Sequence, residues 1–172
     1  MRLLGDDMTL KKNLQLSMLL TLAVVISIIE SFFPVFSSII PGFKLGLANV
    51  VIVFALFYFG YKEAIFIAIF KVLLVGILRT GLFSVTFFFS LSGAIVSVLM
   101  MIILYKFNRF SVVGVSLGGA VFHNLGQLLF AALFLNMGQL LYYVPIVILL
   151  AIPSGIIVGF LAKTLVLHFQ DD

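Results

Sequence analysis

The segment VFHNLGQLL, residues 121–129, places two amides and an imidazole within a stretch that carries no charged residue from position 111 to position 162. His123 and Gln127 are four residues apart and share one face of a helix, while Asn124 lies on the flank of that face. Unsatisfied polar groups are costly in an apolar environment, so these side chains need hydrogen-bond partners or a cavity. The segment therefore indicates either hydrogen bonds between helices or a binding site.

Polar groups also interrupt the other apolar stretches, at Glu30, Lys44, Asn49, Lys71 and Arg79. A charge at mid-membrane costs about 2.5–3.5 kcal/mol on insertion scales, so it pairs, reaches an interface or faces a cavity. For Lys71, snorkelling and an internal ion pair are both open. Glu30 and Arg79 fit a structural ion pair as well as ligand contact.

The composition defines the environment of these groups. Of the 172 residues, 64% are hydrophobic and 9% are charged, and the mean hydropathy is +1.36. Such values are typical of an integral membrane protein. Cysteine is absent, which excludes disulfides and thiolate metal sites. The ten Lys and Arg are scattered and form no basic stripe, which argues against nucleic-acid binding.

The apolar stretches must be helices that position the polar groups. A bilayer core about 30 Å thick needs roughly 20 apolar helical residues. We predict an all-α membrane protein with a single domain, residues 1–172, built as a compact bundle of six transmembrane helices. The expected spans are 13–33, 45–61, 63–80, 82–105, 110–136 and 140–167. The second span is short and follows Pro34 and Pro41, so five spans with a re-entrant segment are the alternative.

Basic residues predict the orientation, because short cytoplasmic loops are enriched in Lys and Arg. With six spans, seven of them fall on the side of the two termini: Arg2, Lys11, Lys12, Lys62, Lys106, Arg109 and Lys163. Lys44 and Arg79 fall on the other side. We therefore expect a multi-pass protein of the plasma membrane with both termini in the cytoplasm.

The alternating direction of the spans brings the polar groups together in the outer half of the bundle. We predict an outward-facing substrate pocket lined by Glu30, Lys44, Asn49, Arg79, His123, Asn124 and Gln127, with Lys71 beneath. Two cations against a single carboxylate favour an anionic ligand, and nearby phenylalanines favour an aromatic or apolar part.

Pairs of small residues at a spacing of four let helix backbones approach closely. Three such pairs predict packing within one bundle: Gly93 with Ser97, Gly114 with Gly118, and Gly155 with Gly159. On the first span, Ala23 and Ser27 form a small face that either packs internally or contacts another protein.

Enzymatic templates are missing from the sequence. Prenyl transfer through a magnesium diphosphate site requires clustered carboxylates, and the only paired acids are at positions 6–7 and 171–172. His123 and His168 differ too much in depth to share a metal. No nucleotide-binding motif occurs either. We expect no enzyme, no cofactor and no metal, so uphill transport would take its energy from a partner or an ion gradient.

Three segments carry a resemblance to a known family: PGFKLGLANVVIVFALFYFG (41–60), ILRTGLF (77–83) and GGAVFHNLGQLL (118–129). They resemble the Gx transporter family, which is also described as heptaprenyl diphosphate synthase component I. The likeness runs from the first span to the sixth. This group is in turn similar to the substrate-binding S components of bacterial energy-coupling factor (ECF) transporters, which are six-helix membrane proteins of this size.

The resemblance implies a subunit that captures a substrate. An S component binds a vitamin or similar nutrient near its outer face and topples against a transmembrane coupling subunit driven by two cytoplasmic ATPases. The matching docking face is Ala23 and Ser27, where Ser27 replaces an alanine. The synthase description suggests a cargo related to isoprenoids or quinones. Our leading hypothesis is nutrient uptake. The alternatives are a noncatalytic membrane partner of a polyprenyl diphosphate synthase and a structural membrane protein without cargo.

Overall fold

The computed structural model describes residues 2–32 and 46–170, and within these ranges the protein is helical with no β-strand. The elements are α1 (Arg2–Glu30), α2 (Asn49–Tyr58), α3 (Tyr61–Val75), the π-helical turn η1 (Gly76–Thr80), α4 (Val85–Lys106), α5 (Val112–Phe134), the 3-10 turn η2 (Gly138–Tyr143) and α6 (Val144–Gln170). Each of the six predicted segments overlaps one of the six α-helices in these ranges. The all-α fold class is therefore confirmed.

In the part of the chain that the structure describes, four helical segments are long and apolar enough to cross a membrane: 10–30, 85–106, 112–134 and 138–169. The structure thus supports a membrane protein with four candidate spans. Helices α2 and α3 are shorter, and the two further crossings predicted for them stay a prediction.

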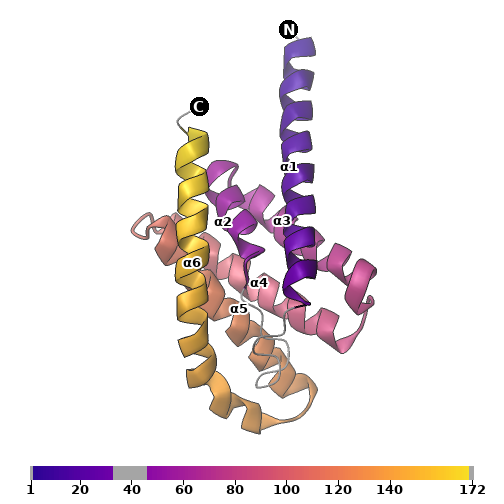
Figure 1. Ribbon diagram of the computed structural model, residues 1–172, viewed down its shortest axis with the longest axis vertical. Coiled ribbons are helices and arrows are strands. Elements are labelled where there is room, and N and C mark those ends of the chain that lie inside the picture. Colours follow the sequence, from indigo (N-terminus) through magenta and orange to yellow (C-terminus); the bar gives the residue numbers. More distant parts are fainter. Residues whose placement is uncertain (1, 33–45, 171–172) are drawn as a thin grey trace.

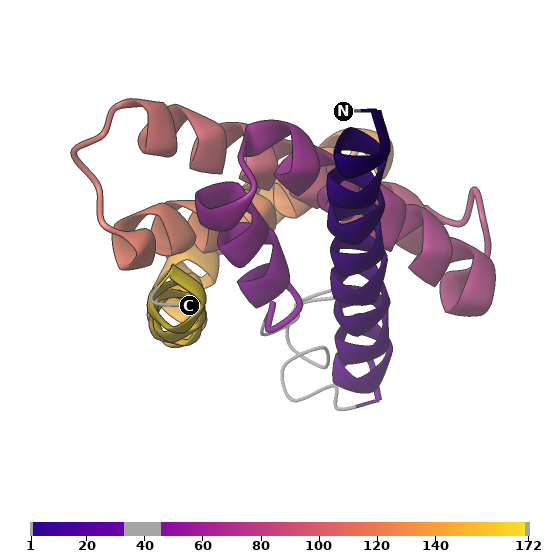
Figure 2. The same cartoon turned by 90° about the horizontal axis from the view of Figure 1, so that it is seen from above.

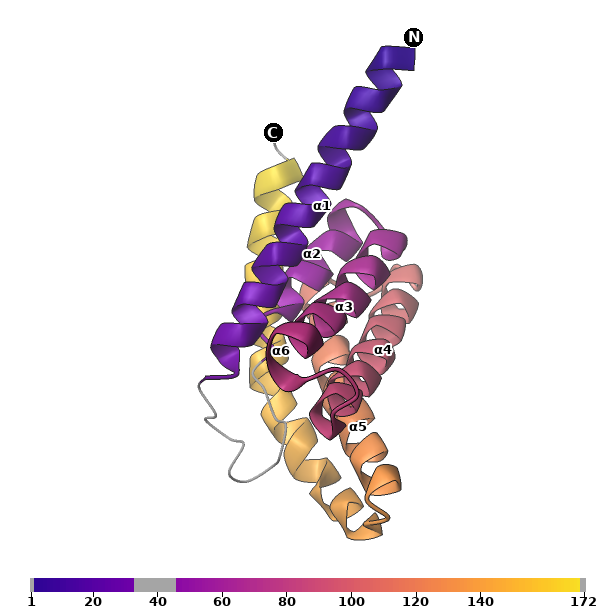
Figure 3. The same cartoon turned by 90° about the vertical axis from the view of Figure 1, so that its right-hand side faces the viewer.

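Successive helices run in alternating directions, and both ends of the chain lie at the same end of the molecule (Figure 1). Seen from that end, α2 lies between α1 and α6 (Figure 2). The N-terminal half of α1 projects beyond the other helices (Figure 3). An ion pair between Lys12 and Glu63 joins this projecting part to the start of α3.

Helix α2 forms the centre of the core. Ten residues at 1.5 Å each cover about 15 Å, half of a bilayer core. Residues 49–56 are all buried, and Val53, Ala55 and Leu56 are inaccessible to solvent. A helix that is apolar on every side is stable where protein surrounds it. The structure therefore explains the short second segment as a helix enclosed by other helices.

Helices α4, α5 and α6 pack closely through small residues. A Cβ added at Gly155 or Gly159 would come within 2.9 Å or 2.7 Å of a Cα atom of α5. The Ser97 hydroxyl donates to the Gly119 carbonyl at 2.8 Å and ties α4 to α5. The Ser116 hydroxyl donates to the Gly155 carbonyl at 2.9 Å and ties α5 to α6. Such contacts hold membrane helices together.

Candidate functional site

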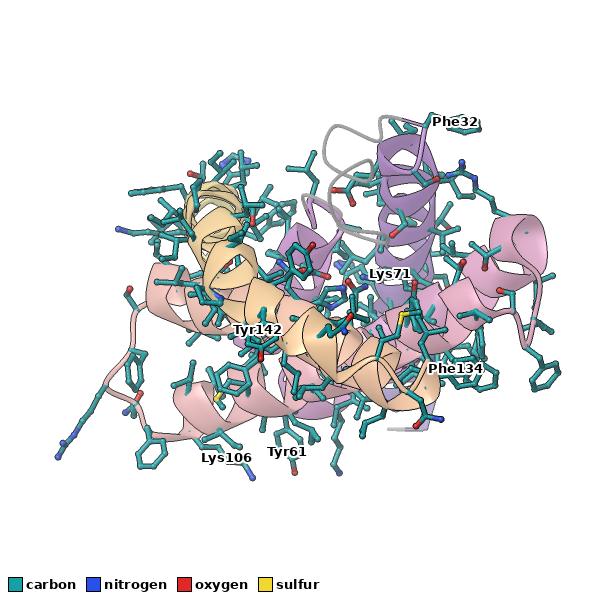
Figure 4. All side chains as sticks on the ribbon, turned by 90° about the horizontal axis from the view of Figure 1, so that it is seen from below. Phe32, Tyr61, Lys71, Lys106, Phe134 and Tyr142 are labelled. Atoms are coloured by element: carbon teal, nitrogen blue, oxygen red, sulfur yellow. The ribbon has the colours of Figure 1, made fainter. Side chains whose placement is uncertain are left out.

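A pocket lies between the end of α1, the start of α2, the end of α3 and the facing parts of α4 and α5. Its polar lining consists of Ser27, Glu30, Asn49, Lys71, Thr80, Ser90, His123 and Gln127. Val72, Val75 and Phe87 supply an apolar wall. Lys71 lies in the interior of the bundle, whereas Phe32 and Phe134 lie at its edge (Figure 4). Four of the predicted site residues are thus brought together, from α1, α2 and α5.

Residues 46–48 form the turn that leads into α2 at the pocket. Gly46 has a φ of +77°, which glycine adopts without steric strain. The Glu30 carboxylate accepts hydrogen bonds from the backbone N–H of Leu47 at 2.8 Å and of Ala48 at 3.5 Å. The first N–H groups of a helix have no partner within the helix and attract negative charge. Glu30 of α1 therefore fixes the start of α2.

Lys71 and Asn49 form a buried polar contact across two helices. The Lys71 ammonium donates to Asn49 Oδ1 at 3.0 Å, and each residue is 6% exposed. A buried ammonium is stable only where its protons find acceptors. This contact holds Lys71 in the pocket, so the alternative of snorkelling to an interface is wrong.

His123 and Gln127 line the pocket from one face of α5, as their spacing predicts. His123 Nε2 and Gln127 Nε2 are 3.2 Å apart. When the amide nitrogen donates, the neutral ring accepts through Nε2 and carries its proton on Nδ1. A Cβ at Gly93 of α4 would come within 2.6 Å of Gln127 Cγ, so Gly93 makes the room that this side chain occupies.

Arg79 does not line the pocket. It lies on η1, and its guanidinium donates to the carbonyls of Ile28 at 3.3 Å and Ser31 at 3.0 Å. The guanidinium also stacks over the Phe32 ring at 4.4 Å. Among the described residues it makes no ion pair with Glu30. Arg79 thus caps the C-terminal end of α1, because the last carbonyls of a helix lack partners within it.

Two predicted site residues remain, Asn124 and Lys44. Asn124 is buried and does not belong to the pocket lining. It lies four residues from Ala120 and from Leu128, which contact α6, so Asn124 is on the side of α5 that faces α6. Lys44 is outside the residues that the structure describes.

The predicted docking residues Ala23 and Ser27 are buried within the chain, at 0% and 7% exposure. Ala23 belongs to the main hydrophobic core, and Ser27 lines the pocket. The protein's own helices therefore cover this face. Contact between a partner and these two residues would require α1 to separate from the bundle.

Sequence reasoning left several pocket residues unassigned, among them Thr80, Phe87 and Ser90. Ser90 lies one helical turn before Gly93 on α4. Gly93 is the small residue next to Gln127, and its position was the sequence signal that could have indicated Ser90. The placement of Arg79 also changes the charge of the site. The described lining carries one ammonium, Lys71, and one carboxylate, Glu30, so the expected excess of positive charge is not present in this part of the chain.

In the described residues, four helices apolar and long enough to cross a membrane, together with a pocket that has a polar lining, define the class as an all-helical membrane protein. The family model described as heptaprenyl diphosphate synthase component I matches residues 19–165, and the chain belongs to that family. No curated protein and no solved structure matches the chain.

Proposed function

We propose that this protein is a membrane subunit that captures a small organic molecule in the pocket. One observation carries the proposal: hydrogen-bonding side chains from α1, α2, α3 and α5 meet in one pocket. Side chains that serve only to join helices would be distributed as separate pairs, as Ser97 and Ser116 are.

The lining favours a ligand with an uncharged or singly charged head. Lys71 and Glu30 balance each other, and the Glu30 oxygens accept hydrogen bonds from the backbone N–H groups of Leu47 and Ala48, just before α2. Lys71, Gln127 and the serine and threonine hydroxyls provide donors for carbonyl or hydroxyl oxygens of a ligand. The apolar wall at Val72, Val75 and Phe87 accommodates a ring or an aliphatic part.

The proposed mode of action follows the S components of ECF transporters. Helices α2 and α3 cross with the other four, both termini lie in the cytoplasm, and the pocket opens to the outside of the plasma membrane. A coupling subunit and two cytoplasmic ATPases supply the energy, since the sequence has no nucleotide-binding motif. The common end of the two termini supports this orientation.

Native mass spectrometry of the purified protein in mild detergent tests ligand capture. We expect the wild type to retain a small molecule and Gln127→Leu to lose it, because leucine keeps the volume and removes the amide. Gln139→Leu is the matched control, since Gln139 lies on η2 outside this pocket. Equal retention in the two variants would contradict the proposed site.

A second candidate is a noncatalytic membrane partner of a polyprenyl diphosphate synthase, which the family description favours. The only paired acids in the sequence lie near the two termini, so a partner would perform the prenyl transfer. Affinity purification from the native membrane distinguishes the two candidates. Copurification with a coupling subunit and ATPases supports transport, whereas stoichiometric copurification with a soluble prenyl synthase and no retained ligand supports the synthase partner.

A further inference from the structure

A series of phenylalanine rings leads from the pocket to the surface of the bundle. Phe87 lines the pocket and is 5% exposed. Its ring centroid is 5.5 Å from that of Phe88, which stacks on Phe130 at 6.2 Å, and Phe130 stacks on Phe134 at 5.7 Å. Phe134 is exposed at the edge of the bundle (Figure 4). We call Phe87, Phe88, Phe130 and Phe134 the phenylalanine track.

Exposure increases along the track in the direction away from the pocket. Phe87 is buried, Phe88 and Phe130 are half-buried, and Phe134 is exposed. Phe83 and Phe89 flank the track, with ring centroids 6.3 Å from Phe87 and 5.9 Å from Phe130. The rings thus form a continuous apolar surface between the start of α4 and the end of α5, and its buried end is a wall of the pocket.

Lipid-facing aromatic side chains are ordinarily explained as an aromatic belt at the membrane interface or as general contact with lipid tails. Neither explanation accounts for this arrangement. Aromatic belts at a membrane interface consist of Trp and Tyr, whose polar atoms reach water, whereas every ring here is Phe. Farther along α4, the exposed positions are aliphatic, at Ile95, Leu99 and Ile103. A lipid-facing surface therefore does not require aromatic side chains in this helix, and the rings are confined to the part that adjoins the pocket.

We propose that the ligand is an amphiphile whose oxygen-bearing head lies in the pocket and whose apolar tail lies along the phenylalanine track. This inference rests on the proposed ligand capture and adds the class of molecule. The balanced charges of Lys71 and Glu30 suit an uncharged ring with carbonyl oxygens, which Lys71 and Gln127 reach as donors. The exposed end of the track lets the tail enter from the lipid bilayer without crossing the polar lining.

Binding of quinones with and without a prenyl tail to the full-length protein in phospholipid nanodiscs tests the inference. The probes are 2-methyl-1,4-naphthoquinone and its derivative with a two-isoprene tail, each measured against empty nanodiscs. The variant Phe130→Ala shortens the track without touching the pocket lining. Phe66→Ala is the matched control, because Phe66 is an exposed ring that contacts Phe70 of the same helix, α3, with ring centroids 4.3 Å apart.

We expect the tail to increase affinity about tenfold or more in the wild type and in Phe66→Ala. In Phe130→Ala, that gain should fall at least fivefold while the affinity for the tail-less quinone is unchanged. Comparing variants in the same lipid removes the contribution of tail partitioning into the bilayer.

The failures of the two proposals are distinguishable. The same gain from the tail in Phe130→Ala, or no binding of either quinone, overturns the amphiphile inference, and bilayer lipid is then what covers the track. A tail-less, water-soluble molecule retained by the wild type in native mass spectrometry also overturns it while ligand capture stands. If nothing is retained and neither quinone binds, ligand capture fails as well.

Discussion

The Lys71 ammonium and the Asn49 amide connect α3 to the first residue of α2 at the pocket. Both side chains are almost fully enclosed, so water cannot replace either partner. A hydrogen bond to a charged group is worth more than a neutral one, and its loss leaves a buried charge with one acceptor fewer. Asn49 should therefore contribute more to the stability of the protein than an amide at a helix start that does not bond a buried charge.

We expect Asn49→Leu to destabilise the protein by about 1.5–3 kcal/mol, because it removes an acceptor from a charged donor. Lys71→Met removes the charge together with its desolvation cost, so a smaller loss should follow. The double variant should match Lys71→Met alone. Thermal unfolding in detergent measures all four proteins. Losses that simply add would mean that the two side chains act independently.

The position of Arg79 at the end of α1 gives a second prediction. Arg79→Ala should lower the free energy of unfolding by about 0.5–1 kcal/mol, since the side chain is exposed and solvent weakens its contacts. Ligand retention should be unchanged because Arg79 does not line the pocket. Thermal unfolding and native mass spectrometry provide the two measurements. Loss of the ligand in Arg79→Ala and its recovery in Arg79→Lys would place the charge in the binding site instead.

The sequence predicted four of the side chains that meet in the pocket, but the direction in which each side chain points depends on the structure. Glu30, Asn49, His123 and Gln127 line one pocket, as their depth in the spans indicated. Arg79 was expected beside them. Its long side chain reaches the last carbonyls of α1, a contact that hydropathy and spacing do not encode.

At the scale of helices, the two α6 glycines allow a close approach of α6 to the backbone of α5. In Gly159→Ala, the new Cβ would lie 2.7 Å from Val113 Cα, which is backbone and cannot rotate away. Separating α5 from α6 should cost about 1–3 kcal/mol. In the control Gly114→Ala, the nearest atom lies at 3.5 Å, and alanine favours the helix by about 1 kcal/mol.

Thermal unfolding should therefore give a lower midpoint for Gly159→Ala and an unchanged or higher one for Gly114→Ala. A midpoint for Gly159→Ala equal to that of the wild type would mean that α5 and α6 are not held at this distance. The same comparison distinguishes predicted small-residue pairs that contact another helix from those that do not. Gly155 and Gly159 contact another helix, whereas the nearest atoms to Gly114 belong to Phe110 and Ser111, just before it in the chain.

Hydropathy predicted where helices occur because a long apolar segment must satisfy its backbone internally. It could not predict how long each helix is or what covers it. Helix α2 is short and its residues 49–56 are buried, and burial in protein selects the same apolar residues as contact with lipid does. The π-helical turn at Gly76–Thr80 likewise has no hydropathy signature. Gly76 permits close approach of Phe87, whose ring would lie 2.7 Å from an added Cβ.

At the scale of the whole molecule, the pocket lies between two sets of helices with different packing. Helices α4, α5 and α6 are joined by close glycine contacts and by the Ser97 and Ser116 hydrogen bonds. On the pocket's other side, α1, α2 and α3 are joined by the polar contacts of Glu30, Lys71 and Arg79. Exchange of a ligand would therefore change the second set more readily than the first.

The number of membrane crossings can be measured because the chain contains no cysteine, so one introduced cysteine reports one position. With six crossings, Tyr61 lies on the cytoplasmic side, between α2 and α3. If only the four long helices cross, residues 31–84 lie together on the outer side and Tyr61 with them. Tyr142→Cys on η2 and Phe107→Cys between α4 and α5 mark the outer and inner sides in both cases.

We expect a membrane-impermeant maleimide to label Tyr142→Cys in intact cells and to label Phe107→Cys only after permeabilisation. Tyr61→Cys should show the same labelling as Phe107→Cys, only after permeabilisation. With six crossings, Lys62 and Lys106 share the cytoplasmic side with the other basic residues. The cation of Lys106 lies 5.2 Å from the Tyr61 ring centroid, so the two turns adjoin and belong on the same side of the bilayer. Labelling of Tyr61→Cys in intact cells would instead place α2 and α3 in a segment that does not cross, and the outward-facing pocket would lose its topological basis.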